Sequence, residues 1–487
     1  MSKFYLTSAI PYVNARPHIG HALEFIQGDT ISRYRKLLGD DVLYLCGSDE
    51  NAIKNVQAAE AANLPVQEFI DKHAKYFEEL AGNLSVEFDV FQKGSDVEKH
   101  YIASQKLWEL CAKNGDIYKK KYKGLYCVGC EEFKTPDQLN EVGECPEHIG
   151  KRLEEVEEEN YFFKLSKYQE TLLKLFDSSE YQIVPEFRKN EILSFIKSGL
   201  QDFSISRSNK RAKDWGVPVP GDPEQRIYVW FDALNIYQSG IGFGSEKQND
   251  LEMYKKWWPA DLHVIGKGII RFHAVYWPAI LLSAGLTLPK ALFVHEYFTV
   301  NGQKMSKTLG NVIDPNEMVE KYGTDALRYY CLAKISPFQD GDFSEEKLKD
   351  AYNSDLANGL GNLVSRVSTL AEKAEYQHEK HVASNNEVLA KNLSFTEAME
   401  LYQFNDAMGF VWSKISDLDR YINIEKPWVL LKENTEKLKG VLSHCVDEIR
   451  EIAVLLKPFM PETAEKISKQ FNKQDINSSE GLFPRIS

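Results

Sequence analysis

The stretch that decides the fold is KFYLTSAIPYVNARPHIGHALEFIQGDTISRYRKLLGDDVLYLC, residues 3–46. It begins with an apolar run that ends at Pro11 and predicts a buried strand, after which apolar residues recur at helical spacing until Gly39. Residues 42–46 predict a second buried strand. A strand, a helix and a strand of these lengths form a βαβ unit, which predicts a parallel sheet with a ligand site at the carboxyl ends of its strands.

Later segments continue this sheet. Residues 261–267 (DLHVIGK) and 291–300 (ALFVHEYFTV) are strand-like, and FHAVYWPAILLSAG between them predicts a helix that ends at Gly285. Residues 116–228 then form an insertion between two halves of the sheet. From Ser344 onward Gly and Pro become rare, and long amphipathic stretches predict an α-helical bundle.

Two further details follow from the pattern. In the bundle we expect an inter-helix loop at Asn385 and Asn386 and a closing helix in KPFMPETAEKI. The acidic run EEVEEEN at 154–160 is typical of a solvated surface.

Composition excludes several classes of protein. The chain has 487 residues and 43% hydrophobic content, which is enough for several modules. It carries no signal-like leader and no apolar run of about 18 residues, so we expect a cytoplasmic protein that contacts no membrane. The formal net charge of -13 argues against coating nucleic acid by bulk attraction, so any RNA contact must be a local patch.

The first motif with chemical meaning is Pro17-His18-Ile19-Gly20-His21, which stands where the loop after the first strand meets the helix. A helix N-terminus presents unpaired N–H groups to an anion, so two histidines there can grip a polyphosphate. Gly20 lets a flat adenine approach the backbone. An isolated H-x-G-H is equally compatible with an ordinary surface loop, but its position after a strand favours the nucleotide site.

The second motif is Lys304-Met305-Ser306-Lys307-Thr308, followed by LGN, in a loop after a strand. Lys304 and Lys307 form a cation pair that can hold a leaving pyrophosphate. Alone, the motif would fit a solvated basic loop. Its combination with the histidine motif favours a site that handles ATP.

The third motif is Cys127-x2-Cys130, then 14 residues, then Cys145-x2-His148. Four soft ligands in two short knuckles predict a closed, tetrahedral structural Zn²⁺ site, one ion per chain, with no open position for catalysis. Free buried thiols are the alternative. The other cysteines stand alone, which argues against a disulfide framework.

The histidine and lysine motifs together resemble those of class I aminoacyl-tRNA synthetases. Within that class, the chain is similar to methionyl-tRNA synthetases over almost its whole length. The stretches that carry the resemblance are AIPYVNARPHIGHALE, YCVGC, SGLQDFSISR, VWFDAL, IGKGIIRFHAVYWPA, FTVNGQKMSKTLGN, YGTDALRYY and EKPW.

The resemblance implies a Rossmann-type parallel-sheet α/β catalytic domain with a zinc-bearing connective insertion, followed by an α-helical bundle that binds the anticodon. The expected domains are the first catalytic half (1–115), the insertion (116–228), the second catalytic half (229–300), the lysine-motif loop with a stem-contact region (301–350) and the bundle (351–487). The implied activity is ATP-dependent ligation of L-methionine to tRNA(Met), including initiator tRNA, through methionyl-adenylate, with Mg²⁺ accompanying ATP and with AMP and diphosphate released.

The resemblance also assigns site residues. The catalytic residues would be His18, His21, Lys304 and Lys307, and these would bind ATP together with Gly20 and Glu24. The methionine pocket would consist of Ile10, Tyr12, Trp230, Ala233, Ile269 and His273, with Asp49 paired to the α-ammonium group. An aromatic, apolar pocket suits a thioether, because sulfur-to-ring contacts contribute about 0.3 to 1.5 kcal/mol each.

In the helical half, Asn362 and Arg366 lie four residues apart on one helix face, and Trp428 follows in EKPW. In the family, matching residues read the CAU anticodon. An aromatic stack on an unpaired base contributes roughly 1 to 3 kcal/mol. A bundle-packing role for Trp428 is the alternative.

The chain departs from the family at a few positions. Asp49 is followed by Glu50-Asn51-Ala52, where relatives usually carry a His-Gly pair. Gly268 follows Lys267, where relatives often have an acid, and the lysine motif ends in Thr308 rather than serine. The first two departures affect nucleotide contacts at those points, and the third keeps a hydroxyl group.

Three rival functions fit less well. A synthetase for a branched amino acid needs a larger editing insertion, and a cysteine enzyme would place zinc in its amino-acid pocket. A catalytically inactive tRNA-binding module would not need intact histidines and lysines in both motifs.

The end of the chain bears on the oligomeric state. The bundle ends around Ile467, and the polar tail NKQDINSSEGLFPRIS could not bury the roughly 1,000 Å² of a stable interface, which predicts a monomer.

Overall fold

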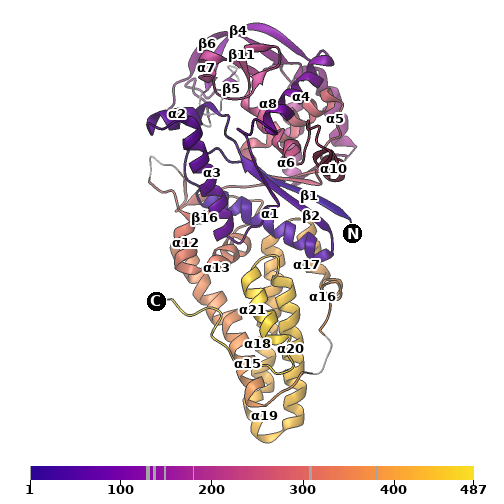
Figure 1. Ribbon diagram of the computed structural model, residues 1–487. Coiled ribbons are helices and arrows are strands. Elements are labelled where there is room, and N and C mark those ends of the chain that lie inside the picture. Colours follow the sequence, from indigo (N-terminus) through magenta and orange to yellow (C-terminus); the bar gives the residue numbers. More distant parts are fainter. Residues whose placement is uncertain are drawn as a thin grey trace.

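The computed structural model describes residues 2–127, 132–134, 139–146, 150–178, 180–305, 310–378 and 382–486, with the side chains of residues 132, 133 and 304 left out. Figure 1 shows a wide α/β part joined to a narrower helical part. No helix among the described residues is long and apolar enough to cross a membrane.

The core of the α/β part is a parallel sheet, as the sequence predicts. Its described strands follow the order β3-β2-β1-β12-β13-β7, with bounds β1 Lys3–Ser8, β2 Asp41–Ser48, β3 Val90–Lys93, β7 Gln182–Val184, β12 Leu262–Gly266 and β13 Ala291–His295. The two predicted halves meet where β1 pairs with β12, in the register Leu6 to Leu262. Because all these pairs are parallel, the carboxyl ends of the strands share one edge.

Helix α1 (Ile19–Leu38) follows β1 and ends at Gly39, whose left-handed φ of 92° closes the last turn. Its buried face packs against the sheet. The other helices of the catalytic halves are α2 (Ile53–Ala61), α3 (Val66–Asn83), α4 (His100–Lys113), α8 (Val229–Ala233), α9 (Ile236–Ser239), α10 (Gln248–Trp257), the 3₁₀ turn η3 (Lys267–Ile269), the π-helix η4 (Phe272–Tyr276) and α11 (Trp277–Ala284). The predicted helix that ends at Gly285 is therefore a π-helix continued by an α-helix.

The range predicted as an insertion forms its own antiparallel sheet of β5, β4, β6 and β8. The acidic run lies on β6 opposite lysines of β4, with Lys119 against Glu159 and Lys123 against Glu155. The range also supplies β7, the edge strand of the central sheet. Its elements are β4 Ile117–Cys127, β5 Glu132–Lys134, β6 Glu154–Phe163, η2 Leu165–Tyr168, α5 Gln169–Asp177, α6 Glu186–Lys197, β8 Phe203–Ser204, β9 Ser206–Ser208, α7 Asn209–Ala212, β10 Pro218–Val219 and β11 Asp222–Ile227.

The stretch ALFVHEYFTV differs from the prediction of one strand. It forms β13 in the central sheet and β14 (Phe298–Val300) in a separate sheet with β15 (Gln303–Lys304) and β16 (Gly341–Phe343). The break falls at Glu296 and Tyr297, because the Glu296 N–H donates to the Pro337 carbonyl and the Tyr297 carbonyl accepts from the Gly341 N–H. The chain therefore leaves the central sheet, and Lys304, the first residue of the lysine motif, lies on a second, smaller sheet.

The helical part begins after β16, as predicted. Its elements, preceded by α12 Pro315–Tyr322, α13 Thr324–Tyr329 and η5 Tyr330–Lys334, are α14 Glu345–Ala351, η6 Tyr352–Gly361, α15 Asn362–Lys373, α16 Asn385–Lys391, α17 Leu393–Glu400, α18 Phe404–Glu425, α19 Pro427–Glu433, α20 Thr435–Leu456 and α21 Pro461–Phe471. The loop expected at Asn385 and Asn386 is wrong, because a capping box between Ser384 and Glu387 starts α16 there.

The C-terminal tail packs against the helical part. Phe483 contacts Tyr352 edge to face, with ring centroids 5.8 Å apart, and the Tyr352 hydroxyl donates to the Pro484 carbonyl at 2.9 Å. Asn353 bonds Ile486 in both directions. The tail is therefore bound to the helix that leads into the bundle.

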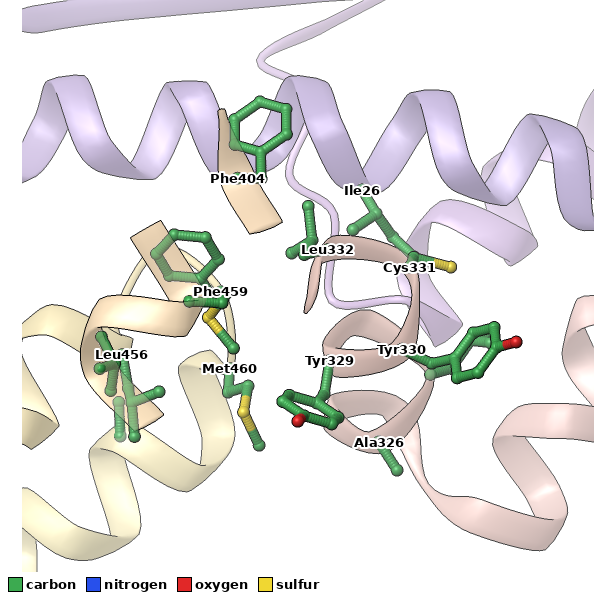
Figure 2. Close-up of a cluster of buried hydrophobic side chains, with 14 of the residues drawn as sticks. Ile26, Ala326, Tyr329, Tyr330, Cys331, Leu332, Phe404, Leu456, Phe459 and Met460 are labelled. Carbon is green, nitrogen blue, oxygen red and sulfur yellow. The ribbon is translucent and has the colours of Figure 1, made fainter. Parts of the chain in front are cut away.

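An apolar cluster joins the two parts (Figure 2). It draws on α1 through Ile26, on α13 and η5 through Tyr329 and Leu332, and on the bundle through Phe404 and Phe459. Because these side chains are buried together, α1 belongs to the core of both the catalytic part and the bundle.

A buried arginine lies in the same joint. Arg328 is fully buried, pairs with Asp29 of α1 at 2.7 Å, and donates to the carbonyls of Leu84, Pro458 and Phe459. Asp29 also pairs with Arg33 at 2.7 Å. We call Arg328, Asp29 and Arg33 the joint cluster. With its donors satisfied on three segments, Arg328 fixes the bundle to α1.

Candidate active site

A cavity of about 610 Å³ opens at the carboxyl edge of the central sheet. It brings together the described residues that the sequence assigns to ATP and methionine, namely Ile10, Tyr12, His18, Gly20, His21, Glu24, Asp49, Trp230, Ala233, Ile269 and His273. They come from the loop after β1, the start of α1, the end of β2, α8 and the turns after β12. Segments far apart in the sequence thus form one site.

The histidine motif is fixed by its own backbone. His18 caps α1, where its Nδ1 accepts from the Gly20 N–H, and the His21 Nδ1 accepts from the His18 N–H, both at 3.1 Å. The two rings stack with centroids 3.9 Å apart. Because each Nδ1 is an acceptor, each neutral ring carries its proton on Nε2 and can donate it to an anion.

Burial, and next the neighbouring His18, lower the pKa of His21 well below its usual value. The ring is therefore a neutral donor at physiological pH. Gly20 leaves room for the His18 ring, because a Cβ at position 20 would lie 3.0 Å from that ring and crowd it. The helix N-terminus and two Nε2–H groups together suit a phosphate chain.

The part of the cavity that the sequence assigns to methionine is aromatic. Trp230 stacks on Phe272 at 3.7 Å between ring centroids. Burial lowers the pKa of His273 to about 4, so its ring is neutral. Its Nδ1 lies 3.0 Å from the Ile269 carbonyl and its Nε2 lies 2.8 Å from the Tyr237 hydroxyl. The proton therefore sits on Nδ1, and Nε2 accepts from Tyr237.

Asp49 also lines the cavity. Its N–H donates to the Pro11 carbonyl at 2.9 Å, and its carbonyl accepts from Asn55 at 2.8 Å. The backbone of Asp49 also forms an isolated parallel β-bridge with that of Tyr12. The Tyr12 ring centroid lies 3.3 Å from the Lys54 ammonium nitrogen. Asp49 is thus a buried acidic residue in the wall of the cavity.

The departure after Asp49 has a structural role. The Asn51 side chain donates to Asp232 at 2.6 Å and to the Gly94 carbonyl at 2.8 Å. Asp232 in turn lies 2.7 Å from the buried His100. Asn51 therefore ties the Asp49 loop to α4 and α8 below the cavity.

The lysine motif is described only in part. Gln303 and Lys304 form β15, which pairs with β14, and the Met305 side chain lines the cavity near Gly20. The Lys304 side chain, Lys307 and Thr308 lie outside the described residues. The backbone of the motif thus approaches the histidine motif from the second sheet.

Four ionic side chains form what we call the cavity-wall cluster. Lys267, Glu296 and Asp340 line the cavity, and Arg188 pairs with Glu296. The Lys267 Nζ lies 2.7 Å from Glu296 and 2.6 Å from Asp340. Arg188 donates to Glu296 from Nε at 2.9 Å and also from Nη2. Partial burial opposes the shift, but the bonds to Asp340 and Glu296 raise the pKa of Lys267.

Several lining residues carry no sequence signal of their own. Tyr237, His295, Glu296, Tyr297, Thr299 and Asp340 line the cavity but were not predicted. His295 is bonded to Glu24 at 3.0 Å. The ends of β13 and β12 are the positions where the rule for parallel sheets places ligand-binding residues, and that rule would have found His295 and Lys267.

At the far end of the bundle, Arg366 and Trp428 lie together. The Arg366 guanidinium carbon is 5.2 Å from the Trp428 ring centroid, and Arg366 pairs with Asp419 at 2.8 Å. Trp428 is 42% exposed, which excludes a buried packing role for it. Asn362 is exposed one turn before Arg366 on α15. The three residues expected to read an anticodon thus share one surface.

Of the expected zinc ligands, Cys127 and Cys145 are buried at the end of β4 and in the loop before β6. Cys130 and His148 lie outside the described residues. Within the described part of the chain no group of three or more His, Cys, Asp or Glu side chains could hold a metal.

Comparison with known proteins agrees with the family resemblance of the sequence. The family profile described as "tRNA synthetases class I (M)" matches residues 4–156 and 148–368. The profile described as "Anticodon-binding domain of tRNA ligase" matches residues 388–486. Fold, cavity and profiles define a class I aminoacyl-tRNA synthetase.

Individual relatives narrow the class. The methionine--tRNA ligase of Thermotoga maritima is 43% identical over 99% of this chain and 77% of its own length, and that of Nostoc sp. is 42% identical over 97% and 91%. The structure of Mycobacterium tuberculosis methionyl-tRNA synthetase in complex with methionyl-adenylate aligns over the whole of both chains, with a TM-score of 0.90 and 36% identity. The chain belongs to the methionine--tRNA ligase family.

Proposed function

We infer that this protein activates L-methionine with ATP and transfers it to tRNA(Met), including initiator tRNA. One observation carries the inference: a single cavity joins the histidine turn at the start of α1 to an aromatic pocket that faces the buried Asp49. The first part suits the phosphates of ATP and the second suits a thioether with an α-ammonium group.

In the proposed reaction, the methionine carboxylate attacks the α-phosphorus of Mg²⁺–ATP and diphosphate leaves. His18 and His21 donate Nε2–H groups to the phosphates, and Lys304 and Lys307 hold the leaving diphosphate. Glu24 and Gly20 complete the nucleotide site, and Asp49 orients the ammonium group. No side chain becomes a nucleophile, because position and charge stabilisation carry the rate. The terminal ribose hydroxyl of tRNA then attacks the adenylate carbonyl and releases AMP.

Methionine-dependent exchange of pyrophosphate into ATP tests this function, followed by charging of a tRNA with the CAU anticodon. Activity with methionine and none with cysteine, valine or isoleucine is the expected result. Absence of exchange with every amino acid would leave a tRNA-binding module as the function.

We also propose that Asn362, Arg366 and Trp428 read the anticodon. An exposed indole beside a guanidinium offers a stacking face and hydrogen-bond donors to unpaired bases. The Trp428→Ala variant should raise KM for tRNA without changing pyrophosphate exchange.

A structural zinc site in the insertion is proposed as well. Two of its four expected ligands, Cys127 and Cys145, are buried thiols, which fit a closed site. When bound, Zn²⁺ would hold the two knuckles together. The Cys145→Ser variant should lose about one zinc per chain, measured by atomic absorption, while the helical part keeps its circular dichroism. The domain limits given above, a cytoplasmic location and a monomeric state stay predictions.

A further inference from the structure

The cavity-wall cluster has no role in the reaction as described above. Lys267 stands directly after β12 and lines the cavity together with His18, Gly20 and His21. Among the described residues that line this cavity, Lys267 is the only lysine or arginine. A triphosphate needs cations, so the placement of Lys267 bears directly on ATP.

The two carboxylates that hold Lys267 differ in exposure. The Glu296 side chain is 6% exposed, whereas that of Asp340 is 48% exposed. Each Glu296 oxygen has its own cation, with Oε1 facing Arg188 and Oε2 facing Lys267. The solvated pair with Asp340 is worth little and can be exchanged for a phosphate oxygen, while the buried pair with Glu296 stays.

Position 268, directly after Lys267, carries no side chain that could hold the lysine, and the buried carboxylate comes from Glu296, directly after β13. A Cβ at Gly268 would lie 2.4 Å from the Tyr297 hydroxyl oxygen. That hydroxyl accepts the Gly268 N–H at 2.7 Å. A side chain at position 268 would therefore displace the Tyr297 hydroxyl group, and Glu296 is the buried carboxylate that pairs with Lys267.

We propose that Glu296 and Arg188 are positioning residues for ATP, which hold the Lys267 ammonium group at the nucleotide end of the cavity. Arg188 lies on α6, within the predicted insertion, so the insertion takes part in ATP binding without touching ATP. The inference rests on the proposed function and adds two residues to it. ATP binding exchanges the Asp340 bond of Lys267 for a phosphate and leaves the Glu296 bond in place.

The test uses the full chain and the variants Glu296→Gln and Arg188→Met. We expect Glu296→Gln to raise KM for ATP about tenfold in pyrophosphate exchange and to change KM for methionine less than about twofold. Arg188→Met should raise KM for ATP about threefold, because Glu296 remains but is less well held. The double variant should exceed Glu296→Gln by less than about twofold, since both residues act through Lys267.

Lys189→Met is the matched control. Lys189 lies beside Arg188 on α6 and pairs only weakly with the exposed Glu186, at 3.9 Å. The KM values of the Lys189→Met variant for ATP and for methionine should equal those of the unsubstituted protein. Calorimetry with Mg²⁺ and a non-hydrolysable ATP analogue gives the same comparison without turnover, so it decides the inference even if the parent shows no exchange.

The outcomes separate the two claims. A parent without methionine-dependent exchange contradicts the proposed function, whereas an active parent whose variants raise both KM values together, or neither, contradicts only the present inference. Loss of analogue affinity in Glu296→Gln with unchanged methionine affinity, measured by tryptophan fluorescence, supports it and excludes general misfolding.

Discussion

The joint cluster and the cavity-wall cluster each contain an arginine paired with a buried carboxylate, but they differ in what surrounds the pair. Arg328 and Asp29 are closed off on all sides, with side-chain exposures of 0% and 1%. In the cavity-wall cluster, Glu296 is buried while Lys267 and Asp340 face the cavity and solvent. A closed cluster can only hold its segments together, whereas a half-open one can exchange a partner for a ligand.

The strongest way to break this comparison is Arg328→Met. The variant leaves Asp29 buried with Arg33 as its one remaining cation among the described residues and removes the arginine donor from three carbonyl groups. Removing one side of a buried ion pair costs about 3 kcal/mol or more of folding free energy. Urea unfolding followed by circular dichroism should show this loss.

Arg420→Met serves as its control, because Arg420 pairs with Asp417 on the exposed face of α18, where both side chains are more than half exposed. This variant should change the folding free energy by less than about 0.5 kcal/mol. Equal losses in the two variants would mean that burial does not distinguish the joint cluster.

A second test moves to the cavity itself. In His21→Ala the Nε2–H donor beside the phosphates is lost, so kcat of pyrophosphate exchange should fall by about a hundredfold, as for other lost transition-state donors. Folding free energy should change little. His73→Ala on α3 removes a histidine that does not line the cavity and should keep full activity. A drop in stability without a drop in kcat would place His21 among the structural residues.

A smaller effect is expected at Asp340, the exposed carboxylate of the cavity-wall cluster. Because Asp340 is to give way when ATP binds, Asp340→Asn should change KM for ATP by no more than about threefold. Steady-state exchange at varied ATP measures it. A rise as large as that of Glu296→Gln would show that the two carboxylates act alike and that exposure does not divide their roles.

The smallest expected effect concerns methionine affinity, which should stay constant as the pH changes. Burial lowers the pKa of His273 to about 4, so the ring stays neutral and keeps accepting from Tyr237 as the pH falls through its ordinary value of about 6.5. Methionine affinity, measured by tryptophan fluorescence, should therefore show no step between about pH 7.5 and about pH 5.5. A step centred near pH 6.5 would mean that His273 titrates as an exposed histidine does.

A structural feature could be predicted from the sequence where one short stretch of residues specifies it. The histidine turn was predictable because β1, the turn and α1 are contiguous, so one short stretch specifies both position and chemistry. The start of α16 was missed because Ser384 and Glu387 form a capping box that outweighs the preference of two asparagines for a loop.

Tertiary contacts account for the other differences. An apolar run hid the break between β13 and β14, which hydrogen bonds from a distant segment impose at Glu296 and Tyr297. The same contacts place Glu296 beside Lys267. Tyr237 lies on a short helix whose approach to His273 depends on packing that periodicity does not encode.

Helix α1 has a mechanical consequence. His18 caps its first turn, and Asp29, which pairs with Arg328, lies eleven residues further along, which is about 16 Å at the rise of an α-helix. If α1 tilted as a rigid body about Asp29, a tilt of about 4° would displace the histidine turn by about 1 Å. A displacement of about that size can cost a hundredfold in rate. In the proposed function, the packing of the bundle against α1 at Asp29 would therefore affect the alignment of the two histidines with the phosphates of ATP.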